Sequence, residues 1–352
     1  AQDRSIRIRH AMAASRDIPS VLGPPQPRRE EGSTEEAAQS GCRSRPSRPV
    51  LLDLAKINSW PTLDLAPYLG IAQRLLAERP RNVLRIATWN VWVDSLAQHV
   101  RGRGLLRELC ESAPDVICLQ EVLPEFLGAL RSCRELAAVY RLSPFSINGY
   151  GCVACVRQDW PVDFVEYDLP SSMGRRLLVA DLSRAGERPF TVATAHLESL
   201  SNESTRMQQL RLCAETLRER RGGAALCGDF NFDAAQTFGD WELPEELRTV
   251  PVEEVMLRDE LVDFVDAWPA VHPADPGFTF DGLLNPQCVT SRHERMRYDR
   301  ILVSGTARGP RPCAARLLGL NPVNDWGVCP SDHFGVLVDI EFAHPDEDHR
   351  CY

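Results

Sequence analysis

The strongest constraint on the fold is a series of short apolar segments of strand length, separated from one another by turn signals or helix-like segments. Up to residue 136 strand-like and helix-like segments alternate, and the middle of the chain has neighbouring strands that are most simply antiparallel. This mixture predicts an α/β fold, a four-layer sandwich of two packed mixed β-sheets flanked by helices. Strands are expected at 83–89, 115–119, 151–157, 162–167, 176–182, 189–196, 224–227, 298–303, 314–320 and 334–342, and helices at 95–110, 124–136 and 203–220.

The alternating pattern defines one domain with flanking segments. It continues from residue 81 to residue 343, which is a common length for a single α/β domain. Residues 1–55 are rich in Arg, Pro, Ser and Glu, which predicts a disordered N-terminal tail. Residues 56–80 are expected to form a helical lead-in that Pro80 closes, and residues 344–352 a C-terminal tail.

Composition excludes several classes of protein. A formal net charge of -9 argues against a protein that coats duplex DNA through bulk charge. Lys56 is the only lysine and has no phosphate-loop context, which excludes Walker-type and Schiff-base mechanisms. Most of the 12 cysteines lie in apolar runs, as expected for reduced thiols in an intracellular protein of the nucleus or cytoplasm. No apolar run is long enough to span a membrane, and we expect a monomer.

Polar residues interrupt or directly follow the buried strands at six places. Any one of them is usually a turn or cap residue. Because strand ends collect at one edge of a sheet, six such places together predict a single cleft. The residues are Asn90, Gln120-Glu121, His196, Asp229 with Asn231, Asp299, and Ser331-Asp332-His333.

The run Ser331-Asp332-His333 invites interpretation as a serine hydrolase triad. Successive side chains along a chain diverge, so three consecutive residues cannot link serine to histidine to aspartate. We therefore reject a triad at this position.

The ordered motifs resemble the endonuclease/exonuclease/phosphatase superfamily from Thr88 to Gly335. Within it, the segments at 196–210 and 278–301 are similar to the tyrosyl-DNA phosphodiesterase 2 subfamily. The resemblance rests on Thr88-Trp89-Asn90, Leu119-Gln120-Glu121-Val122, His196-Leu197-Glu198-Ser199, Gly228-Asp229-Phe230-Asn231, Tyr298-Asp299-Arg300 and Ser331-Asp332-His333-Phe334-Gly335.

The resemblance implies a role for each polar residue. Glu121 matches the principal ligand of a Mg²⁺ ion (or Mn²⁺), and Asp332 matches a ligand that acts through water. Asp229 matches the group that deprotonates the attacking water. Asn90, Asn231 and His196 match groups that bind the phosphate, and His333 matches a phosphate-binding histidine paired with Asp299.

The implied reaction is hydrolysis of 5′-phosphotyrosyl-DNA linkages in DNA repair. The partner would be a nucleic acid that carries a 5′-protein adduct at a single-stranded end. A phenol leaves with little help from a general acid because its pKa is about 10. The side chains expected to contact the substrate are Arg206, Phe280, Asn285, Arg297 and Ser331.

Three departures leave the substrate open. Phe280 stands where the subfamily has Trp, Phe230 replaces Thr, and residues 91–94 differ from the usual pattern. The alternatives are the same chemistry on another phosphoester, such as abasic DNA, an RNA tail, a nucleotide or a phospholipid headgroup, and an inactive scaffold. A scaffold predicts a lost catalytic residue, and every matched position has a competent side chain.

Overall fold

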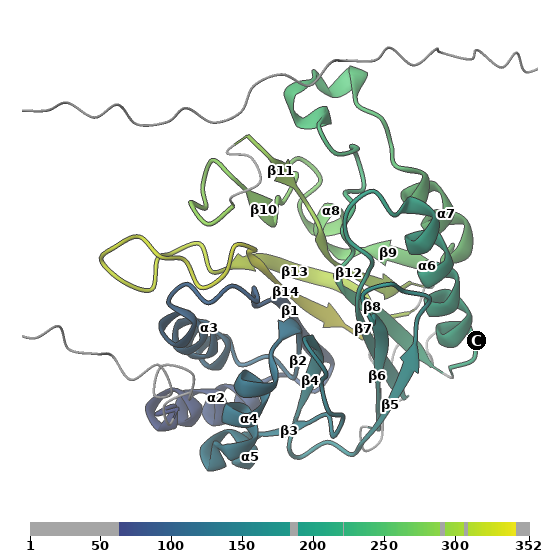
Figure 1. Ribbon diagram of the computed structural model, residues 1–352. Helices are drawn as coiled ribbons and strands as arrows, with labels where there is room; N and C mark the ends of the chain where they lie inside the picture. Colours follow the sequence, from purple (N-terminus) through teal and green to yellow (C-terminus); the bar gives the residue numbers. More distant parts are fainter. Residues whose placement is uncertain (1–62, 184–188, 221, 289–292, 306–308, 343–352) are drawn as a thin grey trace, which may run out of the picture. The chain divides into compact units, whose positions relative to one another are not determined.

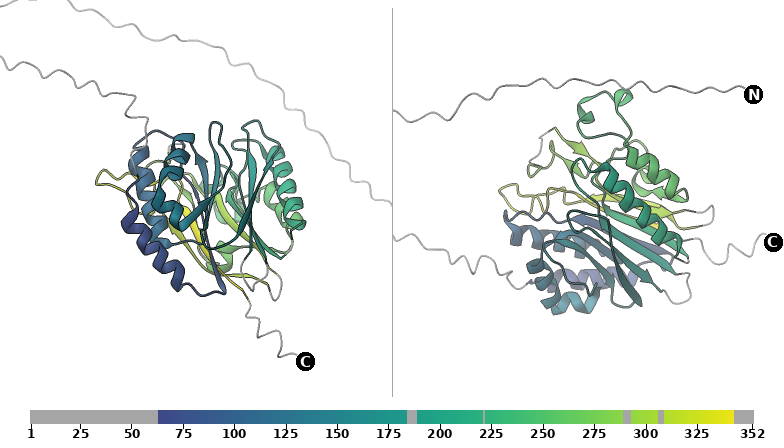
Figure 2. Two further views of the ribbon diagram at one scale, coloured as in Figure 1. Left: turned by 90° about the horizontal axis from the view of Figure 1, so that it is seen from below. Right: turned by 45° about the vertical axis from the view of Figure 1, so that its right-hand side comes forward.

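The computed structural model describes residues 63–183, 189–220, 222–288, 293–305 and 309–342. The tails expected at 1–55 and 344–352, and residues 56–62 of the lead-in, lie outside these ranges. In the described residues two six-stranded mixed sheets pack face to face, with helices on their outer sides (Figures 1 and 2). This arrangement confirms the predicted four-layer α/β sandwich.

The first sheet has the strand order β13-β14-β1-β2-β4-β3. Strands β1 and β2 are parallel, whereas β14 runs antiparallel to β1. The carboxyl ends of β1 and β2 therefore lie at the edge where β14 begins. The strands are β1 (Val83–Asn90), β2 (Val116–Val122), β3 (Tyr140–Leu142), β4 (Gly151–Arg157), β13 (Arg311–Leu318) and β14 (Gly335–Glu341).

The second sheet has the order β5-β6-β7-β8-β12-β9. Here β7 and β8 are the parallel pair, and β12 runs antiparallel to β8 so that Asp299 lies opposite Asp229. The strands are β5 (Val162–Asp168), β6 (Arg176–Leu182), β7 (Phe190–His196), β8 (Gly223–Asp229), β9 (Phe264–Asp266) and β12 (Asp299–Ser304).

Three apolar clusters hold the layers together. One lies between the sheets, where Ile86 and Val116 share a cluster with Val192 and Ile301. The second lies between the first sheet and its helices, and the third between the second sheet and its own. The helices are α2 (Ala66–Glu78), α3 (Gln98–Ser112), α4 (Pro124–Ser132) and α5 (Arg134–Val139) on the first sheet, and α6 (Glu203–Arg218) and α7 (Val252–Glu260) on the second.

Two regions differ from the sequence-based expectations. The helix expected at 124–136 is two helices, because Cys133 between α4 and α5 has an extended backbone (φ −80°, ψ 100°). The irregular region after residue 233, where we expect short helices, contains them and also two short strands that the sequence pattern does not predict. The short helices are η1 (Asp240–Glu242), η2 (Glu245–Leu247) and α8 (Ala267–Val271), and the two strands are β10 (Phe280–Asp281) and β11 (Arg295–Met296).

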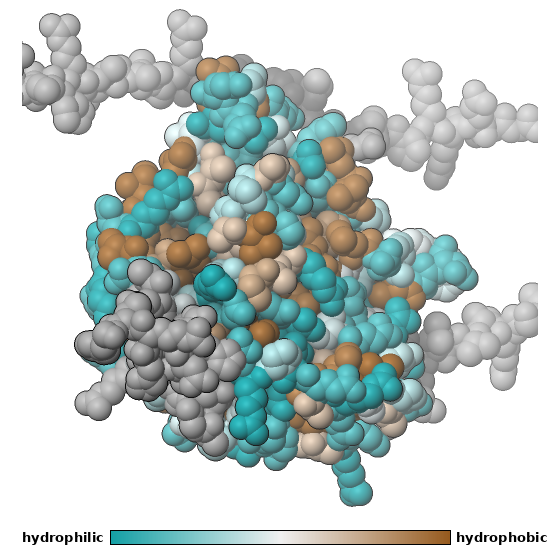
Figure 3. Space-filling view, turned by 180° about the vertical axis from the view of Figure 1, so that it is seen from behind, coloured by the Kyte–Doolittle hydropathy of each residue, from teal (hydrophilic) through white to brown (hydrophobic). Residues whose placement is uncertain are grey.

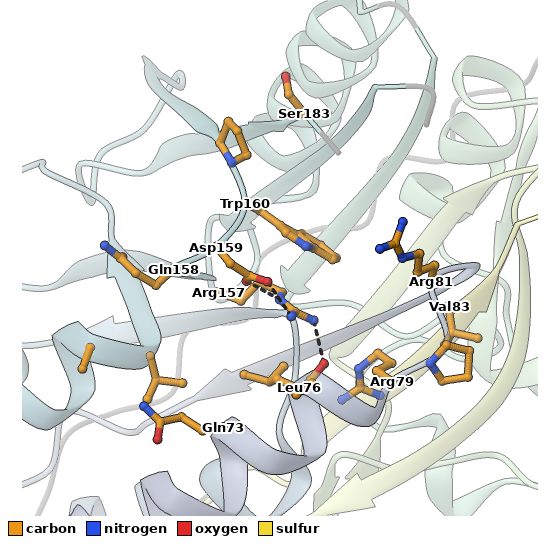
Figure 4. A pocket seen from close by; sticks show the side chains of 15 residues that line it. Gln73, Leu76, Arg79, Arg81, Val83, Arg157, Gln158, Asp159, Trp160 and Ser183 are labelled. Carbon is orange, nitrogen blue, oxygen red and sulfur yellow. Dashed lines mark hydrogen bonds and ion pairs between the residues drawn. The ribbon is translucent and has the colours of Figure 1, made fainter. Parts of the chain in front are cut away.

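Among the described residues, no helix is both long and apolar enough to cross a bilayer. Hydrophobic and hydrophilic residues are interspersed over the face seen from behind (Figure 3). A pocket of about 730 Å³ lies where β1 begins, and Arg79, Arg157 and Trp160 are among its lining residues (Figure 4). It is at the opposite end of β1 from Asn90 and is thus separate from the site described below.

Candidate active site

The amide of Asn90 joins the polar ends of the two sheets. Asn90 ends β1, and its Nδ2 donates to Glu121 Oε1 at 3.1 Å and to Asp229 Oδ2 at 2.9 Å. The backbone N–H of Trp92 donates to Asn90 Oδ1 at 2.9 Å, which fixes the amide orientation. The carboxyl ends of β1, β2 and β8 thus meet in one cluster.

Glu121 reaches this cluster through an irregularity in β2. The register of β2 with β4 shifts between Leu119 and Val122, and Glu121 has φ +58°, in the left-handed region. The N–H of Val93 donates to Glu121 Oε2 at 2.9 Å. The Glu121 side chain is 18% exposed, whereas that of Asp229 is 2% exposed. It is therefore the carboxylate of the cluster that is more open to solvent.

Asp229 is held at both carboxylate oxygens. Besides the contact from Asn90 to Oδ2, the N–H of Asn231 donates to Oδ1 at 2.9 Å. Gly228 has φ +133°, and a Cβ there would lie 1.9 Å from the carbonyl oxygen of Ala195, so only glycine fits before Asp229. Asn231 has φ +55°, and its Nδ2 donates to the carbonyl of Leu197 at 3.0 Å.

His333 and Asp299 form a buried ion pair, with 2.7 Å between Nδ1 and Oδ2. Burial alone lowers the pKa of His333, but the carboxylates of Asp299, Asp332 and Asp229 outweigh burial and raise it well above its usual value. The raised pKa favours the imidazolium form of His333. Its Nε2 lies 4.0 Å from Asp229 Oδ2, so the positive charge faces the same cluster.

His196 is a neutral donor. Arg175 Nη1 lies 3.0 Å from His196 Nδ1, and a guanidinium can only donate, so Nδ1 must accept and Nε2 carries the proton. Nε2 lies 3.4 Å from Asp229 Oδ2. Burial lowers the pKa of His196 to about 3, and the nearby positive charges of Arg175 and His333 act in the same direction. The two active-site histidines thus differ in charge: His196 is neutral, and His333 favours the cation.

The sequence offers Arg175 among several arginines that could contact phosphate, but it does not reveal the hydrogen bonds in the segment around His196. Glu198 is buried and accepts hydrogen bonds from Ser171 Oγ (2.5 Å), Ser172 N (2.9 Å) and Ser172 Oγ (2.6 Å). Arg175 also donates to Ser199 Oγ at 3.1 Å, and its guanidinium lies 5.2 Å from the ring of Tyr150. In the sequence, only the His196-Leu197-Glu198-Ser199 motif points to the residues around His196. Loops such as the one at Ser171 have no periodic pattern from which their contacts could be predicted.

A second buried arginine, Arg101 on α3, organises the opposite wall. It is 1% exposed, and its guanidinium donates to the carbonyls of Val91 (3.0 Å), Leu96 (2.7 Å) and Pro330 (3.2 Å). These carbonyls belong to the loop after β1 and to the segment that leads into Ser331. In the sequence Arg101 is one of several arginines on a helix, and no pattern distinguishes it.

The carboxylates fit a divalent metal ion with oxygen ligands. Burial raises the pKa of Asp332 to about 7, opposed by His333 and reinforced by the negative charge of Glu121, so two carboxylates here compete for positive charge. Asp229, Asp299 and His333 also lie close enough together to suggest a ligand set. Mg²⁺ prefers oxygen ligands, and the raised pKa of His333 favours a protonated ring without a free lone pair, so this set fits Mg²⁺ less well. Glu121 with Asp332 remains the candidate pair.

Two arginines expected at the substrate are instead bound within the protein. Arg206 Nη2 lies 2.7 Å from Glu253 Oε1, and its Nη1 donates to the carbonyl of Leu200 at 2.6 Å. Arg297 Nη1 donates to both carboxylate oxygens of Asp266, at 3.0 and 2.8 Å. Both guanidinium groups are buried, so we no longer expect either to contact the substrate.

Asn285 and Ser331 also contact the protein itself. Asn285 Nδ2 donates to the carbonyls of Ser331 (2.8 Å) and Asp332 (3.1 Å), and Ser331 Oγ donates to the carbonyl of Asn90 at 2.6 Å. Each therefore positions a neighbour of the site. Phe280 is 6% exposed and lies edge-on to His333, with 5.1 Å between ring centroids. Among the five expected substrate contacts, Phe280 touches the His333 ring, and Ser331 Oγ donates to Asp332 Oδ1 at 3.3 Å.

Comparisons with known proteins identify the family of the chain and several relatives. The model of the Endonuclease/Exonuclease/phosphatase family matches residues 87–333. Tyrosyl-DNA phosphodiesterase 2 of Bos taurus is 27% identical over 325 residues, 88% of this chain and 82% of that protein. The Danio rerio protein of the same name is 28% identical over 264 residues, 72% of this chain and 65% of its own length.

A solved structure shows the same architecture. The crystal structure of D. rerio TDP2 complexed with a single-strand DNA product has a TM-score of 0.61 and 26% identity, and covers 74% of this chain and 99% of that chain. The matched residues 87–333 include every polar side chain assembled here, from Asn90 to His333. The chain therefore belongs to the Endonuclease/Exonuclease/phosphatase family.

Proposed function

We propose that the protein is a Mg²⁺-dependent phosphodiesterase that hydrolyses 5′-phosphotyrosyl-DNA linkages in DNA repair. The observation that carries the proposal is the single cluster of Asn90, Glu121, Asp229 and the His333–Asp299 pair. The relatives named tyrosyl-DNA phosphodiesterase 2, and the relative solved with a single-strand DNA product, support this substrate over other phosphoesters.

Asp229 is the proposed base. Hydrogen bonds from Asn90 and Asn231 fix its two oxygens, so a water that donates to this carboxylate is held in one orientation. Asp229 takes a proton from that water as the water oxygen attacks phosphorus. The side-chain oxygen of Asn231 would accept a second hydrogen bond from the same water.

The histidines complement the charge on the phosphate. His333 supplies a full positive charge that Asp299 maintains, and His196 supplies a neutral Nε2–H. Both imidazoles are buried, and in a site of low dielectric such donors stabilise the growing negative charge of the transition state more strongly than in water. Asn90 contributes by position, because both of its amide hydrogens donate to the carboxylates of Glu121 and Asp229.

Glu121 and Asp332 would hold the Mg²⁺ ion (or Mn²⁺), Asp332 through water. When bound, the ion withdraws negative charge from the phosphate oxygens. A phenol leaving group has a pKa of about 10 and needs little protonation as its bond breaks. The chain accordingly needs no further acid beyond the groups already named.

The partner in this proposal is a nucleic acid with a 5′-protein adduct at a single-stranded end. We also propose that the protein acts as a monomer. The substrate also implies work in the nucleus or cytoplasm, where DNA ends are exposed. Fluorescence microscopy of the tagged chain in cells checks this location.

The test is release of tyrosine from a 5′-phosphotyrosyl oligonucleotide by purified protein with Mg²⁺, with Mn²⁺ and with EDTA. A parallel panel contains abasic DNA, an RNA tail, a nucleotide and a phospholipid headgroup. Asp229→Asn keeps the shape of the side chain and removes the base, so we expect kcat to fall by about 10²–10⁴-fold. Asp163→Asn is the matched control, because Asp163 is exposed on β5. Cleavage of another phosphodiester without release of tyrosine would overturn the substrate assignment.

A further inference from the structure

The loop that joins β13 to β14 projects from the active-site end of the first sheet. Because β14 is antiparallel to β1, it begins where β1 ends at Asn90, and loop residue Pro330 directly precedes Ser331. Figure 1 shows this loop in yellow, extending past α3. It carries Trp326, whose 89% exposure is the highest of any large hydrophobic side chain in the described residues.

The tip of the loop is closed by hydrogen bonds that do not involve the indole. The N–H of Val323 donates to the carbonyl of Val328 at 2.7 Å, and Asn324 Oδ1 accepts from the N–H groups of Trp326 and Val328, both at 3.1 Å. Gly327 completes the turn with φ +78°. The tip is thus a defined turn, and it presents the indole to solvent without packing it.

The base of the loop is fixed to the rest of the site. Val323 packs on α3 at Gly104, where an added Cβ would lie 2.2 Å from Val323 Cγ1. Arg101 donates to Pro330 and also to Val91 in the loop after β1. Ser331 is five positions after Trp326, so their Cα atoms are at most about 18 Å apart. The indole is therefore held at a fixed place near Ser331, at a distance that a strand of several nucleotides can span from the reacting phosphate.

The chemistry of the tip favours the face of a base over a phosphate. An exposed indole contributes no burial of apolar surface to the stability of the fold, and a large exposed aromatic side chain usually marks a site of contact with another molecule. Asp325 beside it is exposed and repels phosphate. An unstacked base of a single strand presents a flat face that an indole can cover whatever the sequence. We propose that Trp326 forms a nucleobase-stacking subsite for the single strand that leads away from the reacting phosphodiester, an inference that rests on the proposed DNA substrate.

The test measures binding, which needs no cleavage. Kd is measured for 5′-phosphorylated oligonucleotides, one of about ten nucleotides and one dinucleotide, with wild type and Trp326→Ala. Loss of one stacked base should raise Kd for the longer strand by about 5- to 150-fold and leave the dinucleotide unchanged. Trp326→Phe should retain most of the affinity. Leu320→Ala, which removes another exposed apolar side chain of the same loop (51% exposed), should have no effect.

An abasic scan locates the base. Each base of the longer strand is replaced in turn by an abasic site, and Trp326→Ala should lose its effect at one position only. The subsite would be overturned if Trp326→Ala weakened binding of both oligonucleotides equally, weakened binding of neither, or had the same effect at every abasic position. Unchanged binding of both would leave Trp326 available for a protein partner. Stacking on the product strand without cleavage of the phosphotyrosyl bond would keep the subsite and refute the proposed function.

Discussion

Replacing Arg175 by methionine tests whether an arginine sets the proton position on His196. Arg175 is 5% exposed, and within the described parts of the chain no carboxylate forms an ion pair with it. Its guanidinium donates to His196 Nδ1 (3.0 Å) and Ser199 Oγ (3.1 Å). Methionine has similar length and apolar volume but cannot donate. The change therefore removes the hydrogen bond that forces Nδ1 to accept.

The magnitude follows from what His196 can do without that donor. If the neutral ring moves its proton to Nδ1, Nε2 presents a lone pair to Asp229 Oδ2 at 3.4 Å and to Glu121 Oε1 at 4.0 Å, which is repulsive. If the ring instead gains a proton, it pairs with Asp229 and competes with the water for its base. A hydrogen bond to a charged group contributes about 1.5–3 kcal/mol, so we expect kcat to fall by about 10- to 150-fold. Complete loss of the His196 donor sets the upper limit, about 10²–10³-fold.

The assay combines kinetics with nitrogen NMR of histidine. Wild-type protein with ¹⁵N-labelled histidine should show one ring with a protonated Nε2 and a bare Nδ1 at pH 7, and this signal should disappear in His196→Ala. Arg175→Met should move the signal toward the other tautomer or the cation and should lower kcat on the phosphotyrosyl oligonucleotide.

Arg176→Met is the matched control, because Arg176 is the next residue, its side chain is 48% exposed, and it pairs with Glu166 and Asp168 at the surface. It should change neither the spectrum nor kcat. A wild-type His196 protonated at Nδ1, or an Arg175→Met protein with normal kcat and an intact fold, would refute the reasoning.

Three further predictions concern the other polar groups. Asp299→Asn removes the carboxylate that pairs with His333 at 2.7 Å, and this should lower the pKa of His333. Because His333 acts as a cation, the alkaline limb of the pH–rate profile should shift to lower pH than in wild type. Glu121→Gln should raise the Mg²⁺ concentration needed for half-maximal activity, measured by titration, whereas Glu125→Gln, at the first turn of α4, should not. Arg206→Met leaves Glu253 buried without its partner and should cost about 3–5 kcal/mol in the free energy of unfolding, with little change in KM for folded protein, as denaturant melts and kinetics would show.

Most of the strand positions could be predicted because each strand has its own apolar run between turn signals. The sequence at 83–89 and 224–227 predicts buried strands, and the structure has β1 and β8 there. The break at Cys133 could not be predicted, since residues 124–136 keep helical spacing across it. Local patterns report which residues are buried, whereas tertiary packing decides whether a helix continues.

The same distinction separates the site residues from the substrate residues. The polar residues at the ends of β1, β2, β7 and β8 could be predicted to cluster, because parallel strands bring their carboxyl ends together. Arg206 and Arg297 could not be separated from surface arginines, because the partner of a guanidinium depends on contacts distant in sequence. For Arg297 that partner is Asp266, 31 residues away.

Backbone strain explains why two arginines are buried beside the site. Trp92 and Leu200 both have positive φ without being glycine, which costs about 1–2 kcal/mol per residue. Arg101 donates to carbonyls in the loop that contains Trp92, and Arg206 donates to the carbonyl of Leu200 itself. Each guanidinium thus satisfies carbonyls that a strained loop leaves without strand or helix partners. One loop orients Asn90 and the other follows His196, so these arginines act on the reaction through the shape of the backbone. Arg206 thus binds Glu253 and the backbone in this structure, whereas the sequence motif suggests a contact with substrate.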